Sequence, residues 1–207
     1  MGSDIPKQFI DLAGKPIILR TIERFREYNK DLEIILVLPE NHFDKWKHIC
    51  LEHGFNEDLK LVAGGDERFY SVKNGLKEAS EDSLIAIHDA VRPFVSLQTI
   101  GRCFDMAQKE GSAVPVIVPP ESIREENIHG QSRPLNRDSI RLVQTPQIFR
   151  SEILFRAYDC GYSPHFTDDA TVVESVGTEI RLVEGNTENI KITTPLDLKI
   201  AEALIRK

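Results

Sequence analysis

Short apolar runs that alternate with amphipathic stretches constrain the fold of this chain more than any other feature. Apolar side chains recur at helical spacing between the runs, as in Ile18, Ile22 and Phe25, and the same spacing returns within residues 72–79 and 100–107. Strands that alternate with helices predict an α/β fold with a Rossmann-like, mainly parallel sheet and helices on both faces. The predicted buried strands are residues 34–38, 59–63, 84–87, 113–118, 180–183 and 190–192.

Ligands of such sheets bind beyond the carboxyl ends of the strands, so the residues that follow each apolar run are candidates for a site. Gly64 and Gly65 follow the second run and precede a helix, and Ser71 in its first turn is expected to have a free hydroxyl. Glycines let the backbone approach a flat ligand closely, and the helix start offers N–H groups to an anion. For the two glycines taken alone, a tight strand–helix turn with a solvated, charged rim is the preferred interpretation.

The segment His88–Pro93 follows the third run directly. Asp89 can accept a hydrogen bond from a hydroxyl, and the planar fork of Arg92 can clamp a phosphate. Alternatively, the two form a structural ion pair that ties down the loop. His88 is interpreted as a hydrogen-bonded packing residue rather than a base. Lys191 lies inside an apolar run, where its ammonium needs a partner or water; exposure at a sheet edge is the alternative.

Composition narrows the function further. The 207 residues suit a single domain, residues 1–207, and the net charge of -7 gives no reason to expect nucleic-acid or anionic-membrane binding. No apolar stretch is long enough to span a membrane. The three cysteines are far apart in sequence, so we expect free thiols in the cytoplasm. Residues 119–141 are polar, lack periodicity and are long for a loop, which predicts either an extended arm or disorder.

Four cations stand out once the known nucleophile and metal motifs are found to be absent: Lys7, Arg92, Arg137 and Lys191. Individually, Lys7 and Arg137 read as surface residues, and Thr167-Asp168-Asp169 reads as a helix cap. Cations without a protein nucleophile favour transfer between two phosphates, in which the substrate supplies the attacking oxygen.

Six motifs occur along the chain in a fixed order. They are Pro6-Lys7-Gln8, Gly64-Gly65-Asp66-Glu67-Arg68, His88-Asp89-Ala90-Val91-Arg92-Pro93, Thr145-Pro146-Gln147, Thr167-Asp168-Asp169-Ala170, and Val183-Glu184-Gly185 followed by Asn189-Ile190-Lys191. Together they make the chain resemble the 2-C-methyl-D-erythritol 4-phosphate cytidylyltransferase family, and the resemblance covers essentially the whole chain. It implies a sheet of the nucleotide-diphospho-sugar transferase type, CTP and a polyol phosphate as substrates, and Mg²⁺ or another divalent cation held mainly by the CTP phosphates. It also implies a cytoplasmic homodimer in which the arm at 119–141 reaches the partner.

The resemblance also assigns roles to single positions. Lys7 and Lys191 match the lysines beside the reacting phosphates. Arg137 and Ser122 fall where the arm of one subunit would face the substrate of the other. The remaining matches are Gly64, Gly65, Asp66, Ser71 and Ala90 for the nucleotide, and Asp89, Arg92, Thr145 and Thr167 for the polyol phosphate.

Two departures accompany the resemblance. Family members begin with a strand and a glycine-rich loop of the form Ala-Ala-Gly-x-Gly-x-Arg, whereas this sequence starts where that loop should end. We therefore expect the first strand and the loop to be missing from the sequence given. Ser122 stands where the family has Thr, which keeps the hydroxyl. The competing functions are ribitol-5-phosphate cytidylyltransferase and a catalytically inactive nucleotide-binding regulator.

Overall fold

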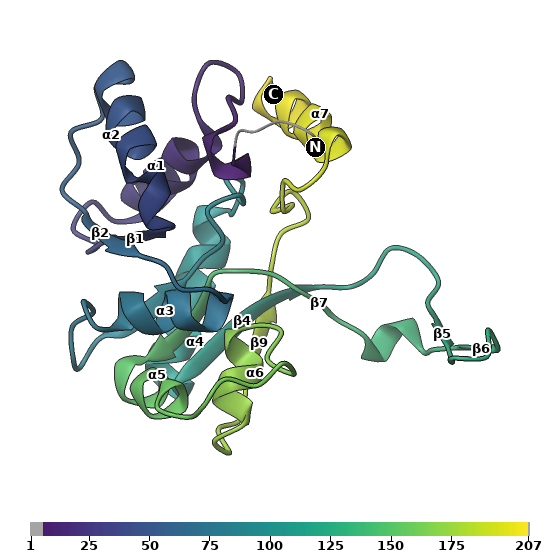
Figure 1. Ribbon diagram of the computed structural model, residues 1–207. Helices are drawn as coiled ribbons and strands as arrows, with labels where there is room; N and C mark the ends of the chain where they lie inside the picture. Colours follow the sequence, from purple (N-terminus) through teal and green to yellow (C-terminus); the bar gives the residue numbers. More distant parts are fainter. Residues whose placement is uncertain (1–5, 207) are drawn as a thin grey trace.

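The computed structural model describes residues 6–206 and contains a two-stranded sheet, a five-stranded sheet and a separate hairpin (Figure 1). Met1-Gly2, where the glycine-rich loop of the family is expected to end, lies outside the described residues. The helices are α1 (Ile17–Tyr28), α2 (Phe43–Glu52), α3 (Arg68–Leu76), α4 (Leu97–Glu110), α5 (Ser151–Tyr158), α6 (Asp169–Glu174) and α7 (Pro195–Ile205), with short 3-10 turns η1 (Lys7–Phe9), η2 (Glu40–His42) and η3 (Arg137–Ser139). The strands are β1 (Ile35–Leu38), β2 (Lys60–Ala63), β3 (Leu84–Ile87), β4 (Ser112–Ile117), β5 (Arg124–Glu126), β6 (Ser132–Pro134), β7 (Leu142–Val143), β8 (Gln147–Arg150) and β9 (Leu182–Glu184).

The larger sheet is mixed, so the prediction of a mainly parallel sheet is wrong. Its order is β3-β8-β4-β7, with β9 also paired to β4; β8 runs antiparallel to both β3 and β4, and β7 runs antiparallel to β4. Parallel pairing is limited to β1 with β2 and β4 with β9. The cause is β8, which the chain reaches on its return from residues 119–141 and inserts between β3 and β4.

Helices cover both faces of the larger sheet, as the alternation of its side chains requires. Val114 and Phe149 face the core formed with α3, α5 and α6. Their neighbours Ala113 and Ile148 face the opposite core, which α4 closes with Cys103 and Ala107. The α/β class is therefore confirmed, although the strand directions are not those expected.

The strand predicted at 190–192 is also wrong. Residues 189–193 form a connection without regular secondary structure that leads into α7. The Ile192 N–H donates to Val91 O at 3.0 Å, which ties this connection to the His88–Pro93 segment. Ile192 is fully buried, whereas Lys191 is exposed, so the lysine carries no burial penalty. The start of α7 is encoded by neighbouring residues: Thr194 caps the helix, Asp197 completes a capping box and Pro195 occupies the first turn.

The segment 119–141 contains an antiparallel hairpin, β5–β6, that projects from the body of the molecule (Figure 1). All residues of both strands are exposed. An isolated two-stranded hairpin is marginally stable in water, so this element gains from packing on another surface.

Candidate functional site

Asp89 and two cations form the centre of the site, at the carboxyl end of β3. The Asp89 carboxylate accepts from Arg92 Nε at 3.0 Å and lies 3.2 Å from Lys191 Nζ, both through Oδ2. Burial raises the pKa of Asp89, but the Lys191 and Arg92 charges outweigh it and hold the pKa below its ordinary value. The predicted Asp89–Arg92 pair is thus present, and Lys191 joins it from a segment about a hundred residues further along the chain.

The free atoms of this cluster define what it can bind. Asp89 Oδ1 has no hydrogen-bond partner in residues 6–206, so it can accept from a substrate hydroxyl. The Lys191 side chain is 46% exposed and retains N–H groups for a phosphate. Arg92 donates through Nη1 to Asn189 O at 2.7 Å, which leaves mainly Nη2 to contact a ligand. Arg92 therefore both braces the loop and presents one edge of its fork.

A chain of hydrogen bonds fixes the conformation of the His88–Pro93 loop. The Asp89 N–H donates to Thr145 Oγ1 at 3.1 Å, and Thr145 Oγ1 lies 3.0 Å from His88 Nδ1. Since His88 Nε2 lies 3.0 Å from the Arg92 carbonyl, which only accepts, we assign the proton to Nε2 and let the Thr145 hydroxyl donate to Nδ1. Thr145 is buried and can offer a substrate only its remaining acceptor capacity.

His88 is a structural residue, as predicted. Burial lowers its pKa to about 4, so the imidazole is neutral at pH 7, and both of its nitrogens are satisfied within the loop. Its ring also meets Phe25 edge-on at a centroid distance of 4.8 Å. A base with both nitrogens engaged is poorly placed to take a proton from a substrate.

Asn189 is a site residue that the sequence reasoning did not single out. It is fully buried, and its Nδ2 donates to the Thr145 carbonyl at 2.8 Å while its own carbonyl receives Arg92. Its Oδ1 is buried without a hydrogen-bond partner in the described chain. The sequence signal for Asn189 was a polar residue two positions before Lys191. Its neighbours in the sequence do not reveal that it contacts both Thr145 and Arg92.

The glycine turn lies at the carboxyl end of β2. Gly64 N–H donates to Leu38 O at 2.8 Å, at the end of β1. A Cβ on Gly65 would lie 2.4 Å from Tyr70 Cβ, so only glycine fits there. The Ser71 hydroxyl accepts from the Gly65 N–H at 3.1 Å and lies 3.2 Å from Glu67 O. This corrects the expectation of a free hydroxyl, because Ser71 already closes the turn.

The structure brings the remaining nucleotide candidates to the same end of the molecule. Ala90 packs against the cluster that contains Phe9, Leu36 and Leu38, so it lies near the ends of β1 and η1. Lys7, the first residue of η1, is exposed and forms no ion pair with residues 6–206. Asp66 is exposed in the glycine turn.

The other predicted polyol contacts are dispersed in the single chain. Thr167 is exposed just before α6, whose N-cap, Asp168, accepts from Gln147 Nε2 at 2.9 Å. Ser122 and Arg137 are exposed in the segment that carries the hairpin, and Arg137 donates only to the nearby Pro120 carbonyl, at 3.2 Å. The described chain therefore does not bring these two to Asp89.

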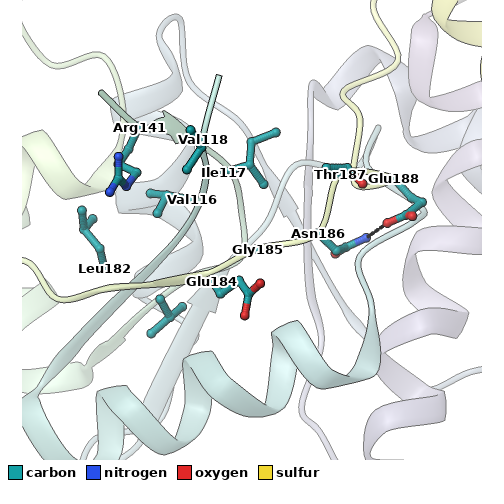
Figure 2. Close-up of a pocket in the computed structure, with 11 residues that line it drawn as sticks. Val116, Ile117, Val118, Arg141, Leu182, Glu184, Gly185, Asn186, Thr187 and Glu188 are labelled. Atoms are coloured by element: carbon teal, nitrogen blue, oxygen red, sulfur yellow. Dashed lines mark hydrogen bonds between the residues drawn. The ribbon is translucent and has the colours of Figure 1, made fainter. Parts of the chain in front are cut away.

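A cavity of about 640 Å³ lies elsewhere (Figure 2). It is bounded by β4, β9 and Arg141, and none of the predicted site residues lines it. Around it, Val118, Leu142, Val143 and Leu182 expose much of their apolar surface. Asp89 and Lys191 do not line this cavity, and its exposed apolar rim has the character of an interaction surface.

A mixed α/β sheet with a tight glycine turn and a cationic cluster at strand ends is typical of transferases that act on nucleotides and phosphate esters. The family profile described as "IspD: 2-C-methyl-D-erythritol 4-phosphate cytidylyltransferase" matches residues 1–207. The chain belongs to this family.

Individual relatives agree. The chain is 48% identical over 205 residues to the 2-C-methyl-D-erythritol 4-phosphate cytidylyltransferase of Bacteroides thetaiotaomicron, covering 99% of this chain and 93% of that protein. It is 39% identical to the protein of the same name from Clostridium botulinum, covering 100% and 94%. The crystal structure of the Thermus thermophilus enzyme of that name matches with a TM-score of 0.79 and 32% identity, over 98% of this chain and 94% of the other.

Two features are absent from the described residues: a helix that could cross a membrane and a side-chain metal cluster. No helix in residues 6–206 combines the length and apolar character that crossing a bilayer needs. Within the same range, no group of three or more His, Cys, Asp or Glu side chains is arranged to hold an ion.

Proposed function

We propose that this chain transfers the cytidylyl group of CTP to 2-C-methyl-D-erythritol 4-phosphate and releases pyrophosphate, a step of isoprenoid precursor biosynthesis. The observation that carries the proposal is the Asp89–Arg92–Lys191 cluster, which combines a free carboxylate oxygen, the exposed Lys191 ammonium and the largely buried Arg92 guanidinium. A polyol phosphate presents the complementary groups: hydroxyls that donate to Asp89 Oδ1 and a phosphate that receives Lys191 and Arg92.

The reaction needs no nucleophile from the protein. An oxygen of the polyol phosphate bonds to the α-phosphorus of CTP, and the bond from that phosphorus to the pyrophosphate oxygen breaks. Lys191 neutralises charge beside the reacting phosphates, and Lys7 does so from η1. The closed turn at Gly65 holds the nucleoside, and Ala90 lies against it. The protein thus contributes position and charge.

Mg²⁺ fits this site only through the nucleotide. Mg²⁺ prefers oxygen ligands, but the Asp89 carboxylate already engages two cations, and the exposed Asp66 belongs to no group of three or more possible ligand side chains in the described residues. We propose that the triphosphate oxygens supply most of the ligands and that the ion, when bound, neutralises phosphate charge.

The active unit is proposed to be a homodimer in which the 119–141 segment of one copy reaches the site of the other. Two features support this. Arg137 and Ser122 are exposed in the 119–141 segment, whose hairpin projects from the body of the molecule (Figure 1). In addition, the apolar strip of Val118, Leu142, Val143 and Leu182 borders the base of that segment and needs a cover.

A coupled pyrophosphate-release assay tests the reaction, with CTP and either 2-C-methyl-D-erythritol 4-phosphate or ribitol 5-phosphate. We expect turnover with the first and little with the second. Turnover only with ribitol 5-phosphate would assign the other polyol, and a folded protein inactive with both would indicate a regulator. Lys191→Ala should lower kcat by orders of magnitude, whereas Lys199→Ala, an exposed lysine in α7, should not.

Mixed dimers test the shared site. Arg137→Ala should weaken binding of the polyol phosphate more than that of CTP. Arg92→Ala should impair the site of the same subunit that carries the substitution. In a heterodimer of the two variants, one site combines an intact Arg92 loop with an intact arm from the other subunit. Such heterodimers should regain about half of the wild-type activity, by the symmetry of a two-fold dimer. Purified heterodimers that show no gain over either homodimer would rule out an arm that crosses the interface.

A further inference from the structure

Arg68 and Asp169 join the starts of two helices, α3 and α6. Arg68, the first residue of α3, donates from Nη1 to Asp169 Oδ1 at 2.9 Å and from Nη2 to Oδ2 at 2.5 Å. Asp169, the first residue of α6, is fully buried and also accepts from the Tyr158 hydroxyl at 2.6 Å. A two-pronged contact of this kind fixes both the separation and the mutual orientation of its partners.

Each end of this contact follows a segment with an assigned substrate. Arg68 comes directly after the glycine turn, whose Gly65 and Asp66 are nucleotide candidates. Asp169 comes directly after Thr167, a polyol phosphate candidate, and the N-cap Asp168. The two residues are 101 positions apart in the sequence. The ion pair is thus a direct side-chain link between the two half-sites.

The start of α6 is also anchored to the sheet. Gln147, in β8, is buried, and its Nε2 donates to Asp168 Oδ2 at 2.9 Å while its Oε1 accepts from the Ala170 N–H at 2.8 Å. Gln147 follows Thr145 by two residues, and Thr145 accepts from the Asp89 N–H, so the start of α6 and the Asp89 loop are held by the same short segment. With the α6 side held on β8, the Arg68 fork sets where the glycine turn sits relative to it.

The environment of Arg68 places it at the edge of the site. Its side chain is 41% exposed although its partner is fully buried. Burial alone lowers the pKa of Arg68, but Asp169 outweighs it and raises the pKa, with a smaller contribution from the Asp89 charge. The guanidinium therefore lies within electrostatic range of the reacting cluster.

We propose that Arg68, held by Asp169 and Tyr158, is a positioning residue that sets the distance between the nucleotide and the polyol phosphate. This inference rests on the proposed cytidylyl transfer. It predicts a specific kinetic signature, because each half-site stays intact when the link is weakened while their separation changes. An error of about 1 Å in the placement of reacting groups can lower a rate by about 100-fold.

The variants Arg68→Lys and Asp169→Asn test the proposal. Lysine keeps the charge but not the fork, and asparagine keeps the volume but not the charge. In both, we expect kcat to fall on the order of 10- to 100-fold, with the KM of each substrate changed by less than about threefold and single-substrate binding by calorimetry similarly little changed. Arg181→Lys is the matched control, since Arg181 pairs with Glu110 and Glu179 on the surface.

Three outcomes would overturn the proposal. A KM for one substrate that rises more than about tenfold at constant kcat would make Arg68 a direct ligand. A lower melting temperature with unchanged kcat per folded enzyme would make the pair purely structural.

Hydrogen exchange gives a readout without turnover: Arg68→Lys should speed exchange in residues 64–71 and 166–171 together, and an effect confined to one segment would refute the link. If the wild type releases no pyrophosphate, cytidylyl transfer fails, and the exchange comparison still decides whether the pair couples the segments.

Discussion

His88 makes the stability of this protein depend on pH. Its imidazole is neutral in the folded state because burial lowers its pKa from 6.5 to about 4. Protonation at Nδ1 would also remove the acceptor for the Thr145 hydroxyl, which in turn holds the Asp89 N–H. The folded loop therefore resists a proton that the unfolded chain accepts readily.

The sign and size of the effect follow from this difference. Between pH 6.5 and about 4 the unfolded state binds the extra proton, so the free energy of unfolding falls as the pH falls through this window. The full difference in pKa corresponds to roughly 3 kcal/mol. Because His88 retains partial access to water, we expect a loss of roughly 2 kcal/mol between about pH 7 and pH 4.5.

Urea unfolding across this range, at fixed protein concentration, measures the effect. His88→Gln keeps a donor for the Arg92 carbonyl but cannot titrate, so its free energy of unfolding should fall less steeply with acid than that of the wild type. His129→Gln, in the exposed hairpin, should follow the wild type. If the wild-type and His88→Gln curves remain parallel through the window, then the buried neutral imidazole is not the source of the pH dependence.

Three further predictions concern packing and charge. Gly65→Ala should cost about 1–3 kcal/mol and weaken CTP binding in calorimetry, because its Cβ would meet Tyr70 at 2.4 Å, whereas Gly161→Ala meets nothing within 4 Å and should leave both unchanged. Phe149→Ala, which removes a fully buried ring, should lower the free energy of unfolding by about 3–5 kcal/mol in urea, and a loss below about 1 kcal/mol would contradict the packing described. Asp89→Asn should lower kcat/KM for the polyol phosphate and destabilise the protein above the ordinary carboxyl pKa of about 4; this stability difference should vanish in stronger acid, since the folded pKa of Asp89 is depressed. Equal acid sensitivity of variant and wild type would refute that assignment.

Local patterns determined much of the fold. The apolar runs at 84–87 and 113–118 became β3 and β4, and the Thr194-Pro195 start became the cap of α7. These features are encoded by neighbouring residues, through side-chain periodicity and caps that bond within one turn. Asp89 and Arg92 were visible for the same reason, because they follow an apolar run, whereas Lys191 stood out as a cation inside one. The resemblance of the motifs to those of the family then implied the substrates.

Tertiary structure decided what depends on distant partners. The antiparallel course of β8 follows from its insertion between β3 and β4, and no periodicity within Gln147–Arg150 records that neighbourhood. Ser71 looked free in sequence, yet its hydroxyl closes the turn at Gly65. Asn189 and the Arg68–Asp169 pair join segments that are far apart in the chain. The sequence by itself determined which residue types were available for phosphate chemistry. Only the tertiary structure decided which of them meet, because hydrogen bonds and ion pairs between loops form only after the sheet order has brought those loops together.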